Sequence, residues 1–385
     1  MILRIDERLF QDPAAARPLT HLLRRLEERE DAVLPWPEDR SVESGSPIGA
    51  WIAARPDDHD RDVFQAMFDL GPIIEASIPE RPNVAGRHQP QRWRRSGPLD
   101  VRVIPGDVSD WRRLQLSIRD TAHLIAEPIH LFFENDVNDY AFLRLLCPAT
   151  QRSELDRLRS SPARLQPRGG GTGMLQQHFR KLAESESLSD EELRRLWRTW
   201  VLFDRDASTT DALMASGTIT TLIANIEQIH QKYGVPVTWI CLQRREIESY
   251  VPDDGLRDLR PRHKHTFVDP IVEWRRGGAR QAWAWAFDMK KGLLGDLSAT
   301  VERERRQELK AGSDLKVQDL KTPFDALGAP DRRRLRCGFG DGWFIKQLSQ
   351  KPRRPWIEEI GTEYDRGPID QIPRAALVQS IFDRI

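Results

Sequence analysis

Trp200-Val-Leu-Phe-Asp-Arg-Asp206 joins a run of four apolar residues to two aspartates. A short and wholly apolar run is typical of a strand that is buried on both faces of a parallel sheet. Two further runs are mostly apolar: Ile129-His-Leu-Phe-Phe133 is followed by Glu134, and Pro236-Val-Thr-Trp-Ile-Cys-Leu242 is followed, after Gln243, by Arg244-Arg-Glu-Ile-Glu248. Each of these runs therefore predicts a strand that ends in acidic residues.

Helical patterns separate the predicted strands. Apolar residues recur at helical spacing after Asp139 and over 174–183, 189–196 and 219–233, and Arg164-Leu-Gln166 is a further short candidate strand. Strands that alternate with helices are typical of βαβ units. We therefore predict an α/β fold over 128–255, with a mostly parallel sheet covered by helices.

The acidic residues are predicted to meet at one edge of this sheet. Ligands of open parallel sheets bind outside the carboxyl ends of the strands, where Glu134, Asp204, Asp206 and Glu248 would lie. Asp204 and Asp206 are two residues apart, and in an extended segment they would point the same way and could share one hard cation. Carboxylates without Cys or nearby His favour Mg²⁺ or Mn²⁺ over zinc. The alternative for each residue taken singly is a helix N-cap or a solvated turn.

The order of these segments resembles the TOPRIM (topoisomerase–primase) domain, especially the versions in OLD-family and stand-alone TOPRIM nucleases of bacterial anti-phage defence. The resemblance covers roughly 128–255 and rests on the segments 131–143, Gly169-Gly-Gly-Thr-Gly173, 201–206 and 242–250. Asn135 stands where the family's first motif has Gly, and the Asn138-Asp139 half of that motif fits with one extra residue.

The resemblance implies a metal-dependent nuclease that hydrolyses DNA or RNA as an effector of antiviral defence. It implies that Asp204 and Asp206 bind Mg²⁺ (or Mn²⁺), that Glu134 is a ligand or general acid/base, and that Glu248 is a further ligand. Two metal ions would suit phosphodiester hydrolysis, because one activates water and the other stabilises the leaving oxygen. The altered motif at Glu134-Asn135 motivates an alternative: a non-catalytic TOPRIM-like sensor or subunit that binds a partner ATPase or nucleic acid.

Basic residues are candidates for contact with nucleic acid or with the charge of the transition state. Trp93 stands among three arginines in a pattern typical of base stacking beside phosphate contacts, although a plain basic surface loop has the same pattern. For the other cations the alternative is a surface or sheet-edge charge. The candidates are Arg92, Arg94, Arg95, Arg205, Arg244, Arg245, Lys290 and Lys291.

The glycine run 169–173 lacks the Lys-Ser/Thr of a phosphate-binding P-loop. It is either a flexible turn or a phosphate contact. We therefore expect no ATPase within this chain, and any ATP dependence would come from a partner ATPase or sensor subunit. Assembly into a homo-oligomer is left open.

Composition sets the wider limits. The 59 Lys plus Arg balance 59 Asp plus Glu, which excludes a chain-wide field of one sign. The three widely spaced Cys residues argue against a disulfide framework and a zinc ribbon. No apolar run approaches the roughly 18 residues that span a bilayer, so a cytoplasmic protein without membrane contact is expected.

Three regions are predicted. Residues 1–125 form an N-terminal domain of unclear fold for recognition or partner binding, 126–258 form the TOPRIM-like catalytic domain, and 259–385 form a mainly helical C-terminal region.

Overall fold

The computed structural model describes most of the 385 residues. The described residues are 1–27, 32–36, 45–77, 93–94, 97–206, 215–263, 266–278, 280–298, 301, 305–321, 323–340, 343, 346–347, 355–367 and 371–383. Among them, no helix is both long enough and apolar enough to cross a membrane.

The central sheet confirms the predicted mixed α/β fold with a mostly parallel sheet. Its strand order is β3-β9-β8-β6-β7, with four parallel strands and one antiparallel edge strand, β3. Every residue of β6, β8 and β9 is buried, as expected for strands covered on both faces. The bounds are β3 (Trp93–Arg94), β6 (Ile129–Phe132), β7 (Leu165–Arg168), β8 (Thr199–Phe203) and β9 (Thr238–Cys241).

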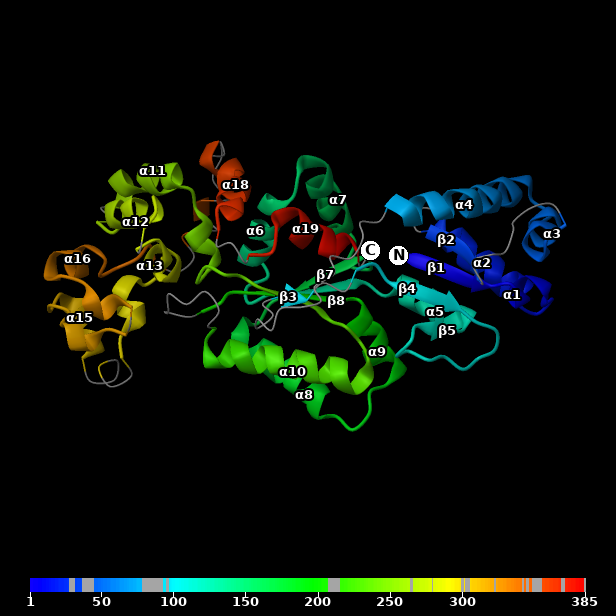
Figure 1. The fold of residues 1–385 in the computed structure, drawn as a ribbon, viewed down its shortest axis with the longest axis horizontal. Coiled ribbons are helices and arrows are strands. Elements are labelled where there is room, and N and C mark those ends of the chain that lie inside the picture. Colours follow the sequence, from blue (N-terminus) through cyan, green and yellow to red (C-terminus); the bar gives the residue numbers. More distant parts are fainter. Residues whose placement is uncertain are drawn as a thin grey trace.

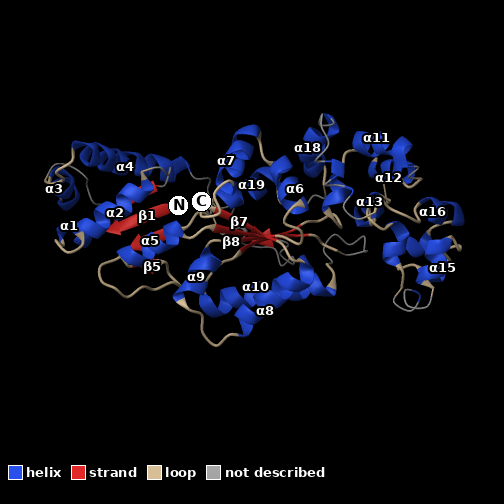
Figure 2. Cartoon of the chain, turned by 180° about the vertical axis from the view of Figure 1, so that it is seen from behind, coloured by secondary structure: helices blue, strands red, loops and turns tan. Residues whose placement is uncertain are grey.

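Helices cover both faces of the central sheet (Figures 1 and 2). Alternate strand residues serve two separate cores: Trp200 and Leu202 belong to one, Val201 and Phe203 to the other. One face carries α6 (Asn138–Leu146), α7 (Ala149–Arg159) and α19 (Arg374–Phe382); the other carries α8 (Gly171–Glu184), α9 (Asp190–Trp197) and α10 (Gly217–Tyr233).

The N-terminal region, whose fold the sequence left unclear, contains a second parallel sheet of order β2-β1-β4-β5. The apolar sides of its helices share one core with the strands, in which Leu19, Leu22, Leu23 and Leu26 are buried. The strands are β1 (Ile2–Asp6), β2 (Ala32–Trp36), β4 (Asp100–Val103) and β5 (Gln115–Leu116), and the helices are α1 (Arg8–Gln11), α2 (Ala16–Leu26), α3 (Pro47–Ala53), α4 (Asp58–Ser77) and α5 (Ile118–Ala126).

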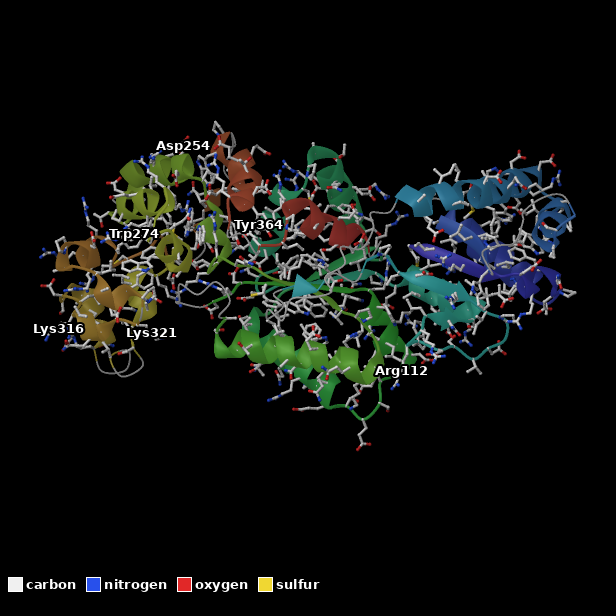
Figure 3. All side chains as sticks on the ribbon, viewed as in Figure 1. Arg112, Asp254, Trp274, Lys316, Lys321 and Tyr364 are labelled. Carbon is white, nitrogen blue, oxygen red and sulfur yellow. The ribbon has the colours of Figure 1, made fainter. Side chains whose placement is uncertain are left out.

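The C-terminal region consists of short helices, as predicted, and it shares a continuous core with one face of the central sheet. Tyr364, labelled in Figure 3, stacks on Tyr250 with ring centroids 5.2 Å apart. The described elements between β9 and α19 are η1 (Ile247–Tyr250), α11 (Asp253–His263), α12 (Val268–Arg275), α13 (Gln281–Ala286), η2 (Gly292–Asp296), α15 (Arg306–Ala311), η3 (Val317–Asp319), η4 (Phe324–Ala326), α16 (Ala329–Arg334), η5 (Pro355–Glu359) and α18 (Ile360–Asp365).

Two segments lie in a different region from the one their sequence position suggests. Strand β3 precedes residue 125 but pairs with β9 in the central sheet. Helix α19 ends the described chain but packs on the central sheet, where the Trp200 Nε1–H donates to Ser380 Oγ at 2.9 Å. The central sheet therefore contains a strand from the N-terminal region and is covered in part by a helix from the C-terminal region.

Candidate functional site

The carboxyl ends of β6, β8 and β9 bring acidic side chains together, as the strand order requires. Glu134 and Asp204 follow neighbouring strands, and the Asp204 backbone N–H donates to Glu134 Oε1 at 3.2 Å. On the other side of Asp204, the Asp206 N–H donates to the Arg245 carbonyl oxygen at 3.1 Å. This contact joins the end of β8 to the loop after β9, which carries Glu246 and Glu248.

We call Glu134, Asp139, Asp204, Glu246 and Glu248 the acidic cluster. Burial raises the pKa of Glu134 to about 6, with a smaller raising effect from Asp206. Burial, followed by repulsion from Glu134, raises the pKa of Asp204 well above its ordinary value. The pKa values of Glu246 and Glu248 are also raised, in both cases chiefly by burial. These carboxyl groups therefore need either protons or a nearby cation at neutral pH.

Lys290 is the cation that the structure places beside this cluster. Its Nζ lies 3.2 Å from Glu248 Oε2 and 3.4 Å from Glu246 Oε2. Burial opposes the charged form of Lys290, but the carboxylates of Glu246, Glu248 and Asp204 outweigh it and raise the pKa of the amine. The ammonium group therefore partly neutralises acidic groups that come from two strand ends.

The turn that carries Lys290 is itself held by acidic side chains. The Lys290 N–H donates to Glu246 Oε1 at 3.1 Å and to Asp288 Oδ1 at 3.0 Å, and the Lys291 N–H donates to Asp288 Oδ1 at 2.6 Å. Asp288 also pairs with Arg245 at 3.2 Å. These contacts fix the position of the Lys290 backbone against the loop after β9.

The Asp204-x-Asp206 pair differs from the prediction. Asp206 has φ 46°, in the left-handed region, so the segment is not extended as far as Asp206. Asp204 is half-buried, whereas Asp206 is exposed at the rim. The expectation that both side chains point the same way because of an extended backbone is therefore wrong, although Asp206 still acts electrostatically on Glu134.

The glycine run packs against the loop that contains Glu134. The N–H groups of Gly170 and Gly171 donate to the Glu134 carbonyl oxygen at 3.3 and 2.8 Å. A Cβ at Gly169 would lie 2.6 Å from the backbone nitrogen of Asp136, a distance that side chains do not tolerate. The sequence predicts a flexible turn or a phosphate contact for the run, and the structure instead places it in a close approach of two loops, in which Thr172 hydrogen-bonds to the Glu134 carboxylate.

Two members of the acidic cluster were not among the predicted site residues. Asp139 is buried, its Oδ2 accepts the Asn135 N–H at 2.9 Å, and burial raises its pKa to about 7. Its place in the first motif, one residue later than the family pattern, was the signal that could have identified it. Glu246 was passed over although it precedes Glu248 by two residues in the same loop.

The metal prediction is tested by the donor atoms and by their arrangement. Among the described residues, no three Asp, Glu, His or Cys side chains converge closely enough to hold a metal ion. The donor chemistry nevertheless fits a hard cation, because every candidate donor is a carboxylate oxygen. Glu248 is fully buried, and its Oε1 accepts no hydrogen bond from the described residues. The donor atoms are thus of the type that binds a hard cation, but they do not converge on one point, and two of them lie beside the Lys290 ammonium group.

The predicted basic contacts need correction at three positions. Arg205, Arg244 and Arg245 are buried. Arg244 Nη1 donates to Glu363 Oε1 at 2.8 Å, and Arg245 Nη1 donates to Asp296 Oδ1 at 2.5 Å. The guanidinium groups of Arg244 and Arg245 therefore position the loop after β9, and burial keeps all three arginines from direct contact with a nucleic acid.

Of the remaining basic candidates, only Lys290 and Lys291 have described side chains. Lys290 lies in the acidic cluster, and Lys291 is exposed beside it. Arg92 and Arg95 lie outside the described residues, and of Arg94 only the backbone, in β3, is described.

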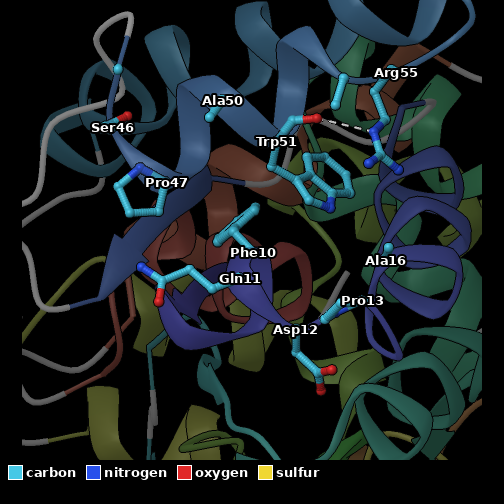
Figure 4. A pocket seen from close by; sticks show the side chains of 12 residues that line it. Phe10, Gln11, Asp12, Pro13, Ala16, Ser46, Pro47, Ala50, Trp51 and Arg55 are labelled. Atoms are coloured by element: carbon cyan, nitrogen blue, oxygen red, sulfur yellow. Dashed lines mark hydrogen bonds between the residues drawn. The ribbon is translucent and has the colours of Figure 1, made fainter.

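A cavity of about 450 Å³ lies between α1 and α3 of the N-terminal region (Figure 4). Its lining residues are distant in sequence from the acidic cluster. Phe10 and Trp51 form its wall, and the Arg55 Nε–H donates to the Trp51 carbonyl oxygen at 3.0 Å. It shares no lining residue with the acidic cluster.

Comparisons of the chain with models of protein families, with curated proteins and with solved structures found no match.

Proposed function

We propose that this chain is a metal-dependent nuclease of the TOPRIM type, which hydrolyses phosphodiester bonds in DNA or RNA. The observation that supports it best is the meeting of Glu134, Asp204 and Glu248 at the carboxyl edge of a parallel sheet. These three side chains come from the ends of three different strands, in the order that the TOPRIM resemblance implies. Their position outside the strand ends is where open parallel sheets bind ligands.

In this proposal Asp204 and Glu248 hold Mg²⁺ or Mn²⁺, and Glu134 is either a further ligand or the general acid/base. The ion lowers the pKa of water and stabilises developing negative charge when it is bound. The raised pKa of Glu134, about 6, lets this carboxyl group exchange a proton near neutral pH, as a general acid or base must. Asp206, exposed at the rim, is an additional ligand from the same loop.

We further propose that the chain acts in antiviral defence beside a partner ATPase. The support is the resemblance together with the glycine run, which lacks the residues of a P-loop and instead packs on the Glu134 loop. An experiment in which the chain protects cells from phage only in the presence of a neighbouring ATPase gene would support this role. Equal protection by the Asp204→Ala variant would contradict it.

Cleavage is the direct test of the proposed function. Purified chain is incubated with supercoiled plasmid and with total RNA, in EDTA, Mg²⁺ or Mn²⁺, and the products are resolved on gels. We expect cleavage only with a divalent cation and none from the Asp204→Ala/Asp206→Ala variant. The matched control is Asp62→Asn, which changes an exposed carboxylate on α4. Absence of cleavage in every condition, or equal cleavage by the double variant, would refute the proposal.

The second candidate is a non-catalytic subunit that retains the fold and binds a partner. Lys290 favours it, because its ammonium group already neutralises part of the acidic cluster. Under this alternative, calorimetry finds no binding of Mg²⁺ or Mn²⁺ and the chain forms a stoichiometric complex with the partner ATPase. Metal binding that the Asp204→Ala variant loses would exclude it.

A further inference from the structure

We infer that Lys290 is an internal counter-cation of the acidic cluster and that a divalent cation binds there by displacing its ammonium group. This inference rests on the proposed metal site, and it adds that Lys290 competes with the metal ion for that site. The residues involved are Lys290, Glu246 and Glu248, whose charged groups are in contact.

The first support is the position of the ammonium group. Lys290 Nζ lies within 3.4 Å of one oxygen of Glu246 and 3.2 Å of one oxygen of Glu248. Its charge also acts on Glu134, Asp139 and Asp204, which belong to the other two strand ends. A single cation therefore contacts the acidic residues after β9 and acts electrostatically on those that follow β6 and β8.

The second support is that the buried Glu248 carboxylate lacks hydrogen-bond donors. This side chain is fully buried, and neither of its oxygens accepts a hydrogen bond from the described residues, although Oε2 lies 3.2 Å from Lys290 Nζ. A buried carboxylate oxygen without a donor is costly. A divalent cation could engage both oxygens, which the single ammonium group does not.

The third support is that the ammonium group can leave while its backbone stays. The backbone N–H of Lys290 is fixed by Glu246 and Asp288, but its side chain keeps 27% exposure. A long, flexible side chain can therefore swing to solvent without unfolding the turn. The metal ion and the ammonium group repel each other and compete for the same Glu246 and Glu248 oxygens, so metal binding would displace Lys290.

The inference predicts a competition that is visible without any nucleic acid. Binding of Mn²⁺ is measured by calorimetry on the wild type and on Lys290→Met, which removes the charge and keeps the length of the chain. We expect Lys290→Met to bind Mn²⁺ tighter by about tenfold or more, because the internal competitor is gone. Lys290→Arg, which keeps the charge, and Lys291→Met, on the exposed neighbour, are expected to bind as the wild type does.

A measurement on the unaltered chain guards against a variant that does not fold. The wild type is treated with an amine-acylating ester with and without Mn²⁺, and modification of Lys290 and Lys291 is followed by peptide mass spectrometry. We expect Mn²⁺ to speed the acylation of Lys290 severalfold relative to that of Lys291. An unchanged or slower reaction at Lys290 would overturn the inference, as would Mn²⁺ binding by Lys290→Met that is no tighter than that of the wild type.

The outcomes separate this inference from the proposed function. A wild type that cleaves nucleic acid, with Mn²⁺ affinity unaffected by Lys290→Met, overturns the displacement alone. Tighter binding by Lys290→Met in a chain that cleaves nothing supports the displacement and overturns the nuclease.

Discussion

The chain contains two parallel sheets, and their strand ends differ in how acidic side chains are neutralised. Asp6 ends β1 of the N-terminal sheet, as Asp204 follows β8 of the central sheet. Asp6 Oδ1 accepts the N–H and the Nε–H of Arg8, each at 3.0 Å, and Oδ2 accepts from Nη2 at 2.7 Å. A residue two positions away thus satisfies Asp6, whereas Asp204 belongs to a cluster that shares Lys290.

This difference shows why an acidic residue after a strand is not enough to identify a site. A carboxylate with its own local partner is a structural element. Carboxylates that are buried together at several strand ends have raised pKa values, and a cation shared among them offsets the rise only in part.

The largest expected effect comes from replacing a carboxylate with the corresponding amide at a strand end of each sheet. Glu134→Gln should lower cleavage on the order of 1,000-fold, because it removes a metal ligand or a general acid/base. Asp6→Asn should leave cleavage unchanged and lower the free energy of unfolding only slightly, because its partner Arg8 is exposed to solvent. Cleavage rates and urea unfolding measure the two. A comparable loss of cleavage in Asp6→Asn would remove the distinction between the sheets.

The next effect concerns what holds the strand end in place. The loop after β9 is fixed by a distant residue, Glu363, whose Oε1 pairs with the buried Arg244 at 2.8 Å. Glu363→Ala should destabilise the chain by about 3 kcal/mol, because it leaves Arg244 buried without its carboxylate. Glu154→Ala, which breaks an exposed pair with Arg157, should cost less than about 0.5 kcal/mol. Urea unfolding that shows equal losses would mean that Glu363 does not anchor this loop.

Much of the central sheet could be predicted from the sequence. The apolar runs before Glu134 and Asp204 lie in buried strands, as their composition requires. The N-terminal sheet could not be predicted, because β2 is the short run Ala32–Trp36 with a proline inside it. Strand β3 has only two residues and carries an arginine, so no periodic signal marks it.

The candidate site could be predicted only in part. Glu134 and Asp204 follow two parallel strands, and ligand-binding residues of such sheets gather at the carboxyl ends of the strands. The predicted topology therefore implies that these two residues lie close together. Lys290 comes from a turn beyond the sheet, so its contact with Glu246 and Glu248 depends on tertiary packing that no spacing reveals. The burial of Arg244 and Arg245 depends in the same way on the C-terminal helices and on Asp296.

A smaller effect is expected where the glycine run meets the Glu134 loop. Gly169→Ala places a methyl group against the Asp136 backbone and should displace this loop, lowering cleavage by about tenfold. Gly173→Ala is the matched control, since its Cβ would meet no atom within 4 Å. As a helical glycine replaced by alanine, it should stabilise the chain by about 0.5 kcal/mol. Equal cleavage by the two variants would show that the close approach at Gly169 does not position Glu134.

The smallest expected effect is a dependence of stability on pH. The pKa of Glu134 is raised to about 6 and that of Asp139 to about 7, so the folded chain keeps protons that the unfolded chain releases near pH 4. The stability that these protons contribute is present at pH 4 and is lost as the pH rises through 6 and 7. Asp139→Asn keeps an acceptor for the Asn135 N–H but cannot ionise, so its melting temperature should fall less than that of the wild type over this range. An equal fall in both would contradict the shift at Asp139.

The binding of Mn²⁺ to the purified chain, without nucleic acid, tests the account most directly. The loss of the free-ion signal in electron paramagnetic resonance is recorded for the wild type, Asp204→Asn and Asp6→Asn. We expect saturable binding by the wild type and by Asp6→Asn, and none by Asp204→Asn. Binding that Asp204→Asn retains in full, or the absence of binding by the wild type, would contradict a metal site at the acidic edge of the central sheet.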